Sequence, residues 1–481
     1  MKKTFFLMGP LLAGWLAGCS VGPNYHPPQV AAPTNFTSGA EAGLSTNAPA
    51  DDWWRGFGDA ELVQLVNRAL ASNWDLHIAT ANLLQARALR LGAKSDFFPA
   101  IDGQASYTNT KYSEAQLFNA PGAPRTQELY DIGFDAVWEL DIFGRLRRAS
   151  QASTASMQAA AASLRDVQVS LVSEVARNYF QLRGAQNEVG VLHRNAENQD
   201  QTLKITQARL DAGGGTELDV ARARAQLNNT LAAIPPMEAT VAHAIHRLGV
   251  LTGQNPEALT AQLGASQPLP GLPSLVAIGN PSELLRRRPD IRAAERNLAA
   301  ATAGIGVAVA DLFPRVVFNG AIGLSAESFA GLSRPGSDTR TFGPSITWAA
   351  LDYGHVRSRI KAAGAVAEAA LGRYQETVLT SLEETENALV DFGRAKARRA
   401  FLMESVKASQ EAADLAHSRY DNGATDFLTV LDAERVLLDA QDQLAQTEMQ
   451  TATALVAVYK ALGGGWENQP DAAASSNSNR K

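Results

Sequence analysis

The chain has 481 residues, a formal net charge of −6 and hydrophobic residues at 45% of its positions, enough for a large core or several domains. No block of basic residues is present, so we expect no nucleic-acid partner. A single cysteine excludes a disulfide framework and a cysteine-rich metal site.

The first residues predict a lipoprotein signal peptide. A short positive start precedes the apolar stretch Phe5–Ala17, which is too short to span a bilayer as a mature helix. The stretch leads into "LAGC", which resembles a bacterial lipobox ending at Cys19. We expect residues 1–18 to be removed, Cys19 to carry a diacylglyceryl group and a further acyl chain such as palmitate, and residues 19–58 to form a lipidated segment. An ordinary signal peptide with a chance cysteine is the alternative.

Two period-two segments follow at about residues 99–142. In the second of them, Ile132, Phe134, Ala136, Trp138 and Leu140 alternate with four acids: Asp131, Asp135, Glu139 and Asp141. Strands of roughly ten residues with this alternation are typical of tilted outer-membrane strands, and we interpret the four acids as lumen-facing. A soluble antiparallel sheet with one wet face shows the same alternation and is the alternative.

A long helical pattern comes next. Residues 144–211 contain no proline and place apolar residues three and four positions apart, at Leu164, Val167, Leu171, Val175, Tyr179 and Leu182. A helix of that length reaches ~100 Å, which suits a spacer or a wall rather than an enzyme core. Gly213 ends it, and a second helical pattern returns towards a predicted break at Pro235-Pro236.

The second half of the chain repeats this order at an offset of about 210 residues. "DFFPAIDGQASY" from Asp96 recurs as "DLFPRVVFNGAIGL" from Asp311, and "VWELDIFGRLR" from Val137 recurs as "TWAALDYGHVR" from Thr347. The predicted organisation is a first repeat at 59–311, a second repeat at 312–462 with strands at about 314–352 and a helical hairpin at 354–462, and a disordered tail at 463–481.

Four strands per chain cannot close a barrel, since the smallest membrane barrels have about eight. An open sheet edge is not stable in lipid because its backbone groups would lack partners. Therefore either the strands lie outside a membrane, or several chains pool them.

Four further motifs stand out: "CSVGPNY" from Cys19, "WWRGFGDAELVQLVNRAL" from Trp53, "LLRRRPDIRAAERNLAAATAGIGVAVADLFP" from Leu284 and "DFLTVLDAERVLLDAQDQLA" from Asp426. In these motifs the chain resembles the TolC-like outer-membrane efflux factors, in the lipidated branch that includes OprM, CusC and NodT. The resemblance implies a mainly α protein with membrane β: a homotrimer whose pooled strands form one 12-stranded β-barrel. A long α-helical barrel with an α/β equatorial region would continue the β-barrel into the periplasm.

The resemblance also implies a function. The protein would be a passive exit duct of a tripartite efflux pump, lipid-anchored in the outer membrane and joined to a periplasmic membrane-fusion adaptor and an inner-membrane transporter. The alternative is a monomeric periplasmic lipoprotein scaffold whose helical hairpins bind partner proteins. No catalytic constellation and no cofactor motif stands out, and His243 with His246 lacks a third ligand, so we expect neither an enzyme nor a metal site.

Asp421 and Asp426, in the turn "DNGATD", are the candidates for a periplasmic gate. Three copies of a turn acid near a symmetry axis would form a ring that repels itself and attracts a cation. The local explanation is that Gly423 ends one helix and Asp426 caps the next. The choice between the two acids stays open at this point.

Overall fold

The computed structural model describes residues 20–29, 33–40, 44–47, 50–113, 125–464 and 466. The chain divides into two compact units. The first unit comprises residues 1–29, 83–160 and 293–374, and the second comprises residues 30–82, 161–292 and 375–481. The predicted signal peptide, Cys19 and the part of the predicted tail after Trp466 lie outside the described residues.

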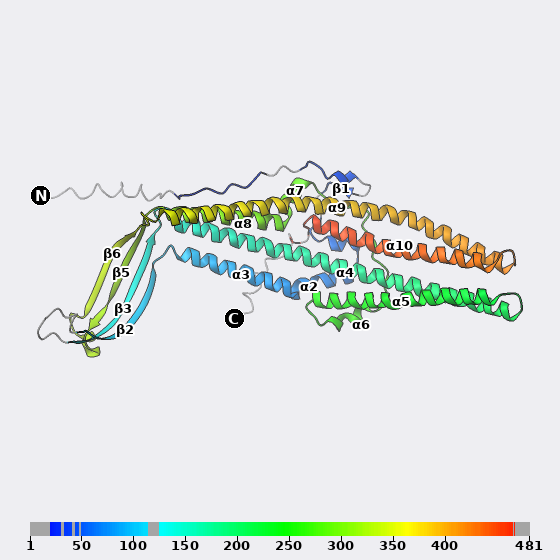
Figure 1. Cartoon of the computed structure of the whole chain (residues 1–481), viewed down its shortest axis with the longest axis horizontal. Coiled ribbons are helices and arrows are strands. Elements are labelled where there is room, and N and C mark those ends of the chain that lie inside the picture. The colour runs from blue at the N-terminus through cyan, green and yellow to red at the C-terminus, as the bar shows by residue number, and fades with distance from the viewer. Residues whose placement is uncertain are drawn as a thin grey trace. The chain divides into compact units, whose positions relative to one another are not determined.

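The first unit contains a four-stranded antiparallel sheet in the order β2-β3-β5-β6 (Figure 1). The strands are β2 (Ala100–Lys111), β3 (Thr126–Leu140), β5 (Arg315–Ala326) and β6 (Asp338–Thr347). Because β3 pairs with β5, the strands of both sequence repeats belong to one sheet. The prediction of four strands in two pairs is confirmed.

The strand register separates an apolar face from a polar face. Residues directly opposite each other share a face, and Phe134 lies opposite Ile322 while Ala136 lies opposite Ile101. The same pairing collects polar side chains on the other face, including Asp102, Gln104, Ser106, Asp131, Asp135, Asn319, Ser325, Thr341 and Ser345. The register therefore agrees with the alternation read from the sequence.

Long helices follow each strand pair, as expected from the proline-free segments. The helices are α3 (Trp74–Ser95), α4 (Arg145–Asp211), α5 (Glu217–Leu251), α8 (Pro289–Ala310), α9 (Tyr353–Asp421) and α10 (Phe427–Ala461). The predicted limits 144–211 and 354–421 differ from α4 and α9 by one residue at the N-terminal end. Within α4, Leu171, Val175 and Tyr179 are buried, so the spacing of three and four residues does mark the packed side of the helix.

Shorter elements complete the fold. They are η2 (Thr37–Ala40), β1 (Leu44–Ser45), η3 (Trp53–Phe57), α2 (Ala60–Ser72), η5 (Pro256–Leu259), α6 (Thr260–Leu263), β4 (Val276–Ala277), α7 (Pro281–Arg287) and η6 (Phe329–Ser333). In the second unit, the ring of Trp53 stacks on Tyr459 at 4.8 Å between centroids, and Phe57 lies 4.8 Å from Phe180. The "WWRGF" motif thus provides aromatic core rather than a binding surface.

The internal duplication is visible in matching elements. α3 and α8 each have 22 residues, α5 and α10 each have 35, and α4 and α9 have 67 and 69. The indole N–H of Trp138 donates to the carbonyl of Phe97, and that of Trp348 donates to the carbonyl of Leu312, at 2.9 and 3.0 Å. Because α8 is the counterpart of α3, the predicted repeat boundary at 311/312 is wrong, and the second repeat begins near α7.

A second expectation also fails. Pro235 and Pro236 were expected to break the helical pattern, yet α5 continues through both of them to Leu251. A proline in a helix interior removes an N–H donor and crowds the preceding turn, but it does not oblige the helix to end where the flanking residues are held by packing. Ile234, directly before the pair, is buried, as are Ala244 and Ile245 after it.

Candidate functional site

Cys19 lies outside the described residues, but the segment directly after it is described. The guanidinium of Arg148, on α4, donates to the carbonyl oxygens of Val21 at 2.9 Å and Gly22 at 3.1 Å. Gly22 has a φ of +84°, and a Cβ there would lie 2.5 Å from Cα of Gly306 on α8. Close backbone packing and charge-assisted hydrogen bonds therefore hold this segment. The sequence did not single out Arg148 for this role.

The polar face of the sheet carries three of the four predicted acids within β3, and two of them, Asp131 and Asp135, lie in the middle of the strand. Asp131 lies opposite Ser106 and Ser325, and Asp135 lies opposite Asp102. Two carboxylates facing each other across adjacent strands repel, which is acceptable where water or cations screen them. Asp102 is a member of this face that the sequence analysis missed, because only the register shows which residues of β2 and β3 are opposite.

Glu139 and Asp141 are in a different situation, because arginines neutralise both of them. The Glu139 carboxylate accepts two hydrogen bonds from Arg145, at 2.7 and 2.6 Å. Asp141 lies beyond the end of β3 and accepts from the backbone N–H groups of Leu146 and Arg147 at 2.9 and 3.0 Å, and from the Arg147 side chain. The expectation that Asp141 is a strand residue is therefore wrong: it caps the start of α4.

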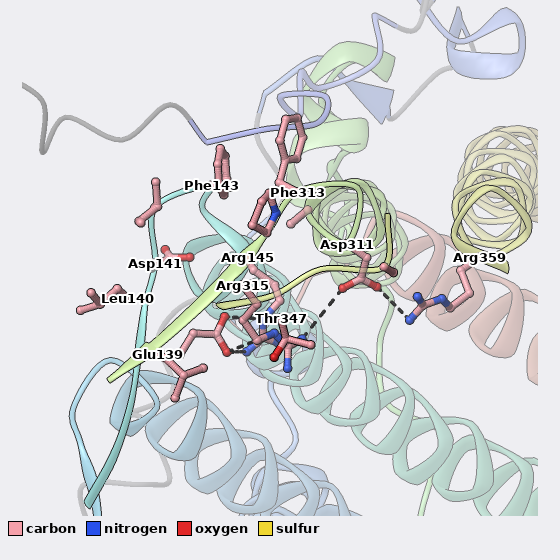
Figure 2. Close-up of a pocket in the computed structure, with 15 residues that line it drawn as sticks. Glu139, Leu140, Asp141, Phe143, Arg145, Asp311, Phe313, Arg315, Thr347 and Arg359 are labelled. Carbon is pink, nitrogen blue, oxygen red and sulfur yellow. Dashed lines mark hydrogen bonds and ion pairs between the residues drawn. The ribbon is translucent and has the colours of Figure 1, made fainter. Parts of the chain in front are cut away.

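A cavity of about 370 Å³ lies where the strands meet the helices of the first unit (Figure 2). We call it the junction pocket; its charged and aromatic lining includes Glu139, Arg145, Asp311, Phe313, Arg315 and Arg359. Arg359 lies 2.9 Å from Asp311, whereas Arg315 lies 3.6 Å from Glu139 and 3.9 Å from Asp311. The pocket thus combines two tight ion pairs with one arginine whose acidic neighbours are more distant.

The two hairpin turns lie in the second unit. The first hairpin turn, between α4 and α5, contains Gly213 with φ +78°, and the second hairpin turn, between α9 and α10, contains Gly423 with φ +70°. In each case the next residue donates its N–H to a carbonyl five positions earlier, Gly214 to Arg209 and Ala424 to Arg419. Both long helices therefore end in the same glycine-dependent motif, as predicted.

The residue types that cap the return helices α5 and α10 are reversed between the two turns: a threonine caps the first helix and an aspartate caps the second. Thr216 caps α5, and Asp219 three positions later bonds back to it. In the second hairpin turn Asp426 caps α10 and accepts from the backbone N–H and the hydroxyl of Thr429, at 3.1 and 2.7 Å. These hydrogen bonds lower the pKa of Asp426. Its carboxylate is thus occupied with local turn chemistry.

Asp421, the other gate candidate, instead connects the two hairpins. Arg209, near the end of α4, donates to the carbonyl of Tyr420 at 3.1 Å and to Oδ1 of Asp421 at 3.3 Å. The same guanidinium lies 3.9 Å from the centre of the Tyr420 ring. This hydrogen-bonded cation–π contact joins α4 to α9, and the sequence alone gave no sign of it.

A second polar link joins the same hairpins. Glu434, on α10, accepts from Thr202 of α4 at 2.9 Å and lies 2.9 Å from Nε2 of His417 on α9. The hydrogen bond to Glu434 raises the pKa of His417. The second carboxylate oxygen of Glu434 and the amide oxygen of Gln199 are buried and have no hydrogen-bond partner among the residues that the structure describes.

A buried acid pair lies between α4 and α10. Nε2 of Gln446 donates to Asp442 at 3.0 Å and to Glu188 at 3.4 Å. Burial, followed by the neighbouring Asp442 carboxylate, raises the pKa of Glu188 to about 7. Glu188 therefore holds a proton at mildly acidic pH.

Two negative findings apply to the described part of the chain. No helix there is long and apolar enough to cross a membrane. Within the same residues, no three or more histidine, cysteine, aspartate or glutamate side chains are grouped so that they could hold a metal ion.

Comparison with known proteins identifies the family. The outer membrane efflux protein family matches residues 65–254 and 280–464. The solvent efflux pump outer membrane protein SrpC of Pseudomonas putida is 31% identical over 463 residues, covering 94% of this chain and 96% of that protein. Nodulation protein T of Rhizobium leguminosarum bv. trifolii is 30% identical over 464 residues, covering 95% and 97%. The solved outer-membrane channel OprN superposes with a TM-score of 0.88 at 44% identity, covering 93% of this chain and 100% of that one.

These matches define the class as channels of the outer membrane. The chain belongs to the outer membrane efflux protein family. It is an exit duct of an efflux pump, as its sequence predicts. The second matched segment begins at residue 280, directly before α7, in agreement with the repeat boundary in the structure.

Proposed function

We propose that three copies of this chain pool their sheets into one 12-stranded barrel, four strands from each copy. The observation that carries the proposal is the exposed apolar face of the sheet. Ile101, Phe134, Ile322, Phe342 and Ile346 belong to this face and are each more than half exposed in the single chain. Such a face is costly in water and favourable against lipid.

The sheet edges support the same assembly. Within the described residues of one chain, β2 and β6 each pair on one side only. In lipid an unpaired edge is forbidden, so β2 of one copy would pair with β6 of the next until the ring closes. The helices α4, α5, α9 and α10 of three copies would then form the tunnel wall through the periplasm.

Cysteine cross-linking tests the assembly. In a Cys19→Ser background, single cysteines at Asp102, Gln104 or Ser106 of β2 are combined with single cysteines at Thr341, Gly343 or Ser345 of β6. We expect at least one pair to give a covalent ladder that ends at the trimer. A matched pair at Gln104 and Ala321 should not cross-link, because β3 separates these strands. A chain that stays monomeric in detergent with every pair would support the lipoprotein scaffold instead.

The anchor and partners complete the proposal. Cys19 would carry lipid in the inner leaflet of the outer membrane beside the barrel, and metabolic labelling with palmitate should be lost in Cys19→Ser. The relatives that are named as efflux pump outer membrane proteins support an exit duct that works with a periplasmic adaptor and an inner-membrane transporter. The duct itself would be passive, with substrate selected by the transporter.

The second hairpin turn would close the periplasmic end of the duct. Arg209 links the two hairpins through Tyr420 and Asp421, and three such links would hold three hairpin pairs in one closed arrangement. Asp426 would serve only as the helix cap, because its carboxylate is already bonded to Thr429. Of the two gate candidates, the contacts therefore favour Asp421.

A further inference from the structure

The junction pocket is lined by three carboxylates and three arginines, and these arginines are not equally engaged. Glu139 is paired with Arg145, Asp141 with Arg147 and Asp311 with Arg359, in each case at 3.0 Å or less. Arg315 forms only the two longest ion pairs of this cluster, to Glu139 and Asp311. Among the described residues, no side chain or backbone group forms a hydrogen bond with its guanidinium, and its closest carboxylates are 3.6 and 3.9 Å away.

Arg315 is also accessible. Its side chain is 47% exposed and lies on β5, where it faces the cavity together with Val317 and Thr347 (Figure 2). Thr347 is its cross-strand partner on β6, so both side chains lie on the same face of the sheet. A guanidinium in this position keeps several N–H donors available for a ligand.

Another wall of the pocket is apolar. The rings of Phe143 and Phe313 stack at 4.6 Å between centroids with 18° between their planes, and Leu140 and Pro314 lie beside them in the lining. A cavity with one available cation and an aromatic wall suits a molecule that carries an anionic group on an apolar body.

The duplication shows that the fold does not require this arginine. Arg315 begins β5, and the residue at the equivalent start of β2 in the first repeat is Ala100. Ala100 pairs with Val137 on β3, and Arg315 pairs with Thr347 on β6, so the two repeats form the same antiparallel pairing with alanine at this position in one and arginine in the other. Arg315 is therefore an addition to the shared architecture rather than a part of it.

We propose that the junction pocket binds an amphiphilic anion, with Arg315 holding its carboxylate, sulfonate or phosphate group and the Phe143–Phe313 pair contacting its apolar body. Every lining residue belongs to the first unit, so the site can be tested separately from the hairpin turns of the second unit. Two sources share this chemistry: an exported solute in the duct and the headgroup of an anionic lipid.

Calorimetric titration of the detergent-solubilised full chain with naphthalenesulfonate tests the site. We expect binding to wild type and an affinity about tenfold lower in Arg315→Gln, the effect of losing one charge-assisted contact. Arg340→Gln is the matched control, because Arg340 lies on the opposite face of the same sheet. Naphthylmethylammonium, with the same apolar body and the opposite charge, should not bind the pocket.

A second variant keeps every arginine. Thr347→Glu places a carboxylate opposite Arg315, which favours a cross-strand pair and should abolish naphthalenesulfonate binding while the protein stays folded. Equal affinity in wild type, Arg315→Gln and Thr347→Glu would overturn the proposal, and so would equal binding of the two naphthalene probes. Repeating the titration in nanodiscs with and without phosphatidylglycerol separates the two sources. If phosphatidylglycerol weakens naphthalenesulfonate binding to wild type but not to Arg315→Gln, the pocket binds a lipid headgroup. If phosphatidylglycerol leaves naphthalenesulfonate binding unchanged, the pocket binds a solute.

Discussion

At the scale of single residues, the two acids of the second hairpin turn have different tasks although they are five positions apart. Asp426 satisfies backbone donors at the start of α10, and Asp421 binds a guanidinium from another hairpin. A cap stabilises its own helix, whereas a contact between hairpins stabilises their arrangement. Only the second kind of contact can differ between a closed and an open duct.

We predict that Asp421→Asn and Arg209→Gln raise the open probability of single channels in planar bilayers, whereas Asp426→Asn does not. Exposed ion pairs contribute up to about 1 kcal/mol each. Loss of the three symmetry-related Arg209–Asp421 pairs of a trimer can therefore shift the equilibrium between the closed and the open duct about tenfold or more. Asp426→Asn is the matched control because asparagine also caps helices. Equal opening in all three variants would mean that loosening of the turn, not the link between hairpins, controls the gate.

Glu188 gives a prediction about stability and pH. Its pKa in the folded chain is about 7, above the ordinary value of 4.5, because of burial and the nearby Asp442. The folded state therefore binds a proton that the unfolded chain releases, and this contribution to stability is full below about pH 4.5 and is lost as pH rises through about 7.

Glu188→Gln should remove that dependence. Thermal melts should show the variant more stable than wild type by roughly 3 kcal/mol per protomer at about pH 8, with little difference at about pH 4.5. Glu197→Gln, at an exposed position of the same helix, should melt like wild type at both pH values. A difference between Glu188→Gln and wild type that does not change with pH would contradict the assignment of the proton.

At the scale of elements, the sheet depends on glycines at its centre. Gly133 of β3 lies directly opposite Gly323 of β5, and a Cβ at Gly133 would lie 2.6 Å from the carbonyl oxygen of Ile322. We predict that Gly133→Ala costs about 1–3 kcal/mol of stability, the usual range for an overpacked site, and reduces the fraction of trimer measured by gel electrophoresis of unheated samples. Gly343→Ala, whose Cβ meets no atom within 4 Å, should behave as wild type.

The long helices and strands were predictable because each follows a simple period over many residues. The segment that became α4 has no proline and a repeat of three and four, and β3 alternates apolar residues with acids, so local sequence decided both. The repeat boundary was not predictable from the motif at Asp311, because the counterpart of α3 differs from it in most residues although Asp75 and Asp290 occupy the same first-turn position.

The site contacts were less predictable, because they join residues far apart in the chain. Arg209 and Asp421 are 212 positions apart, and Thr202 and Glu434 are 232 apart. Glu139 and Asp141 alternated correctly with apolar neighbours, but alternation reports the side of a strand and not the partner that a side chain meets there. Arg145 and Arg147, in the next helix, decided the charge of this region.

At the scale of the whole molecule, the proposed trimer contains three copies of each sheet acid that has no arginine partner among the described residues. Asp131, Asp135 and Asp102 lie on the polar face of the sheet, and their register places Asp135 directly against Asp102. Three copies would bring these carboxylates around one lumen. Glu139 and Asp141 add little to this field, since each carries its own arginine.

Because Asp102, Asp131 and Asp135 form no ion pair with an arginine of the described residues, we predict that the reconstituted duct prefers cations at low salt, and that the preference decreases as the Debye length shortens to about 10 Å near 0.1 M salt. The triple variant Asp102→Asn, Asp131→Asn, Asp135→Asn should lose most of the preference, measured as the reversal potential in a salt gradient. Asp338→Asn is the matched control, because Asp338 lies opposite Leu324 on the apolar face and would not line the lumen. An anion-selective reversal potential in wild type at low salt would mean that the apolar and polar faces of the barrel are assigned the wrong way round.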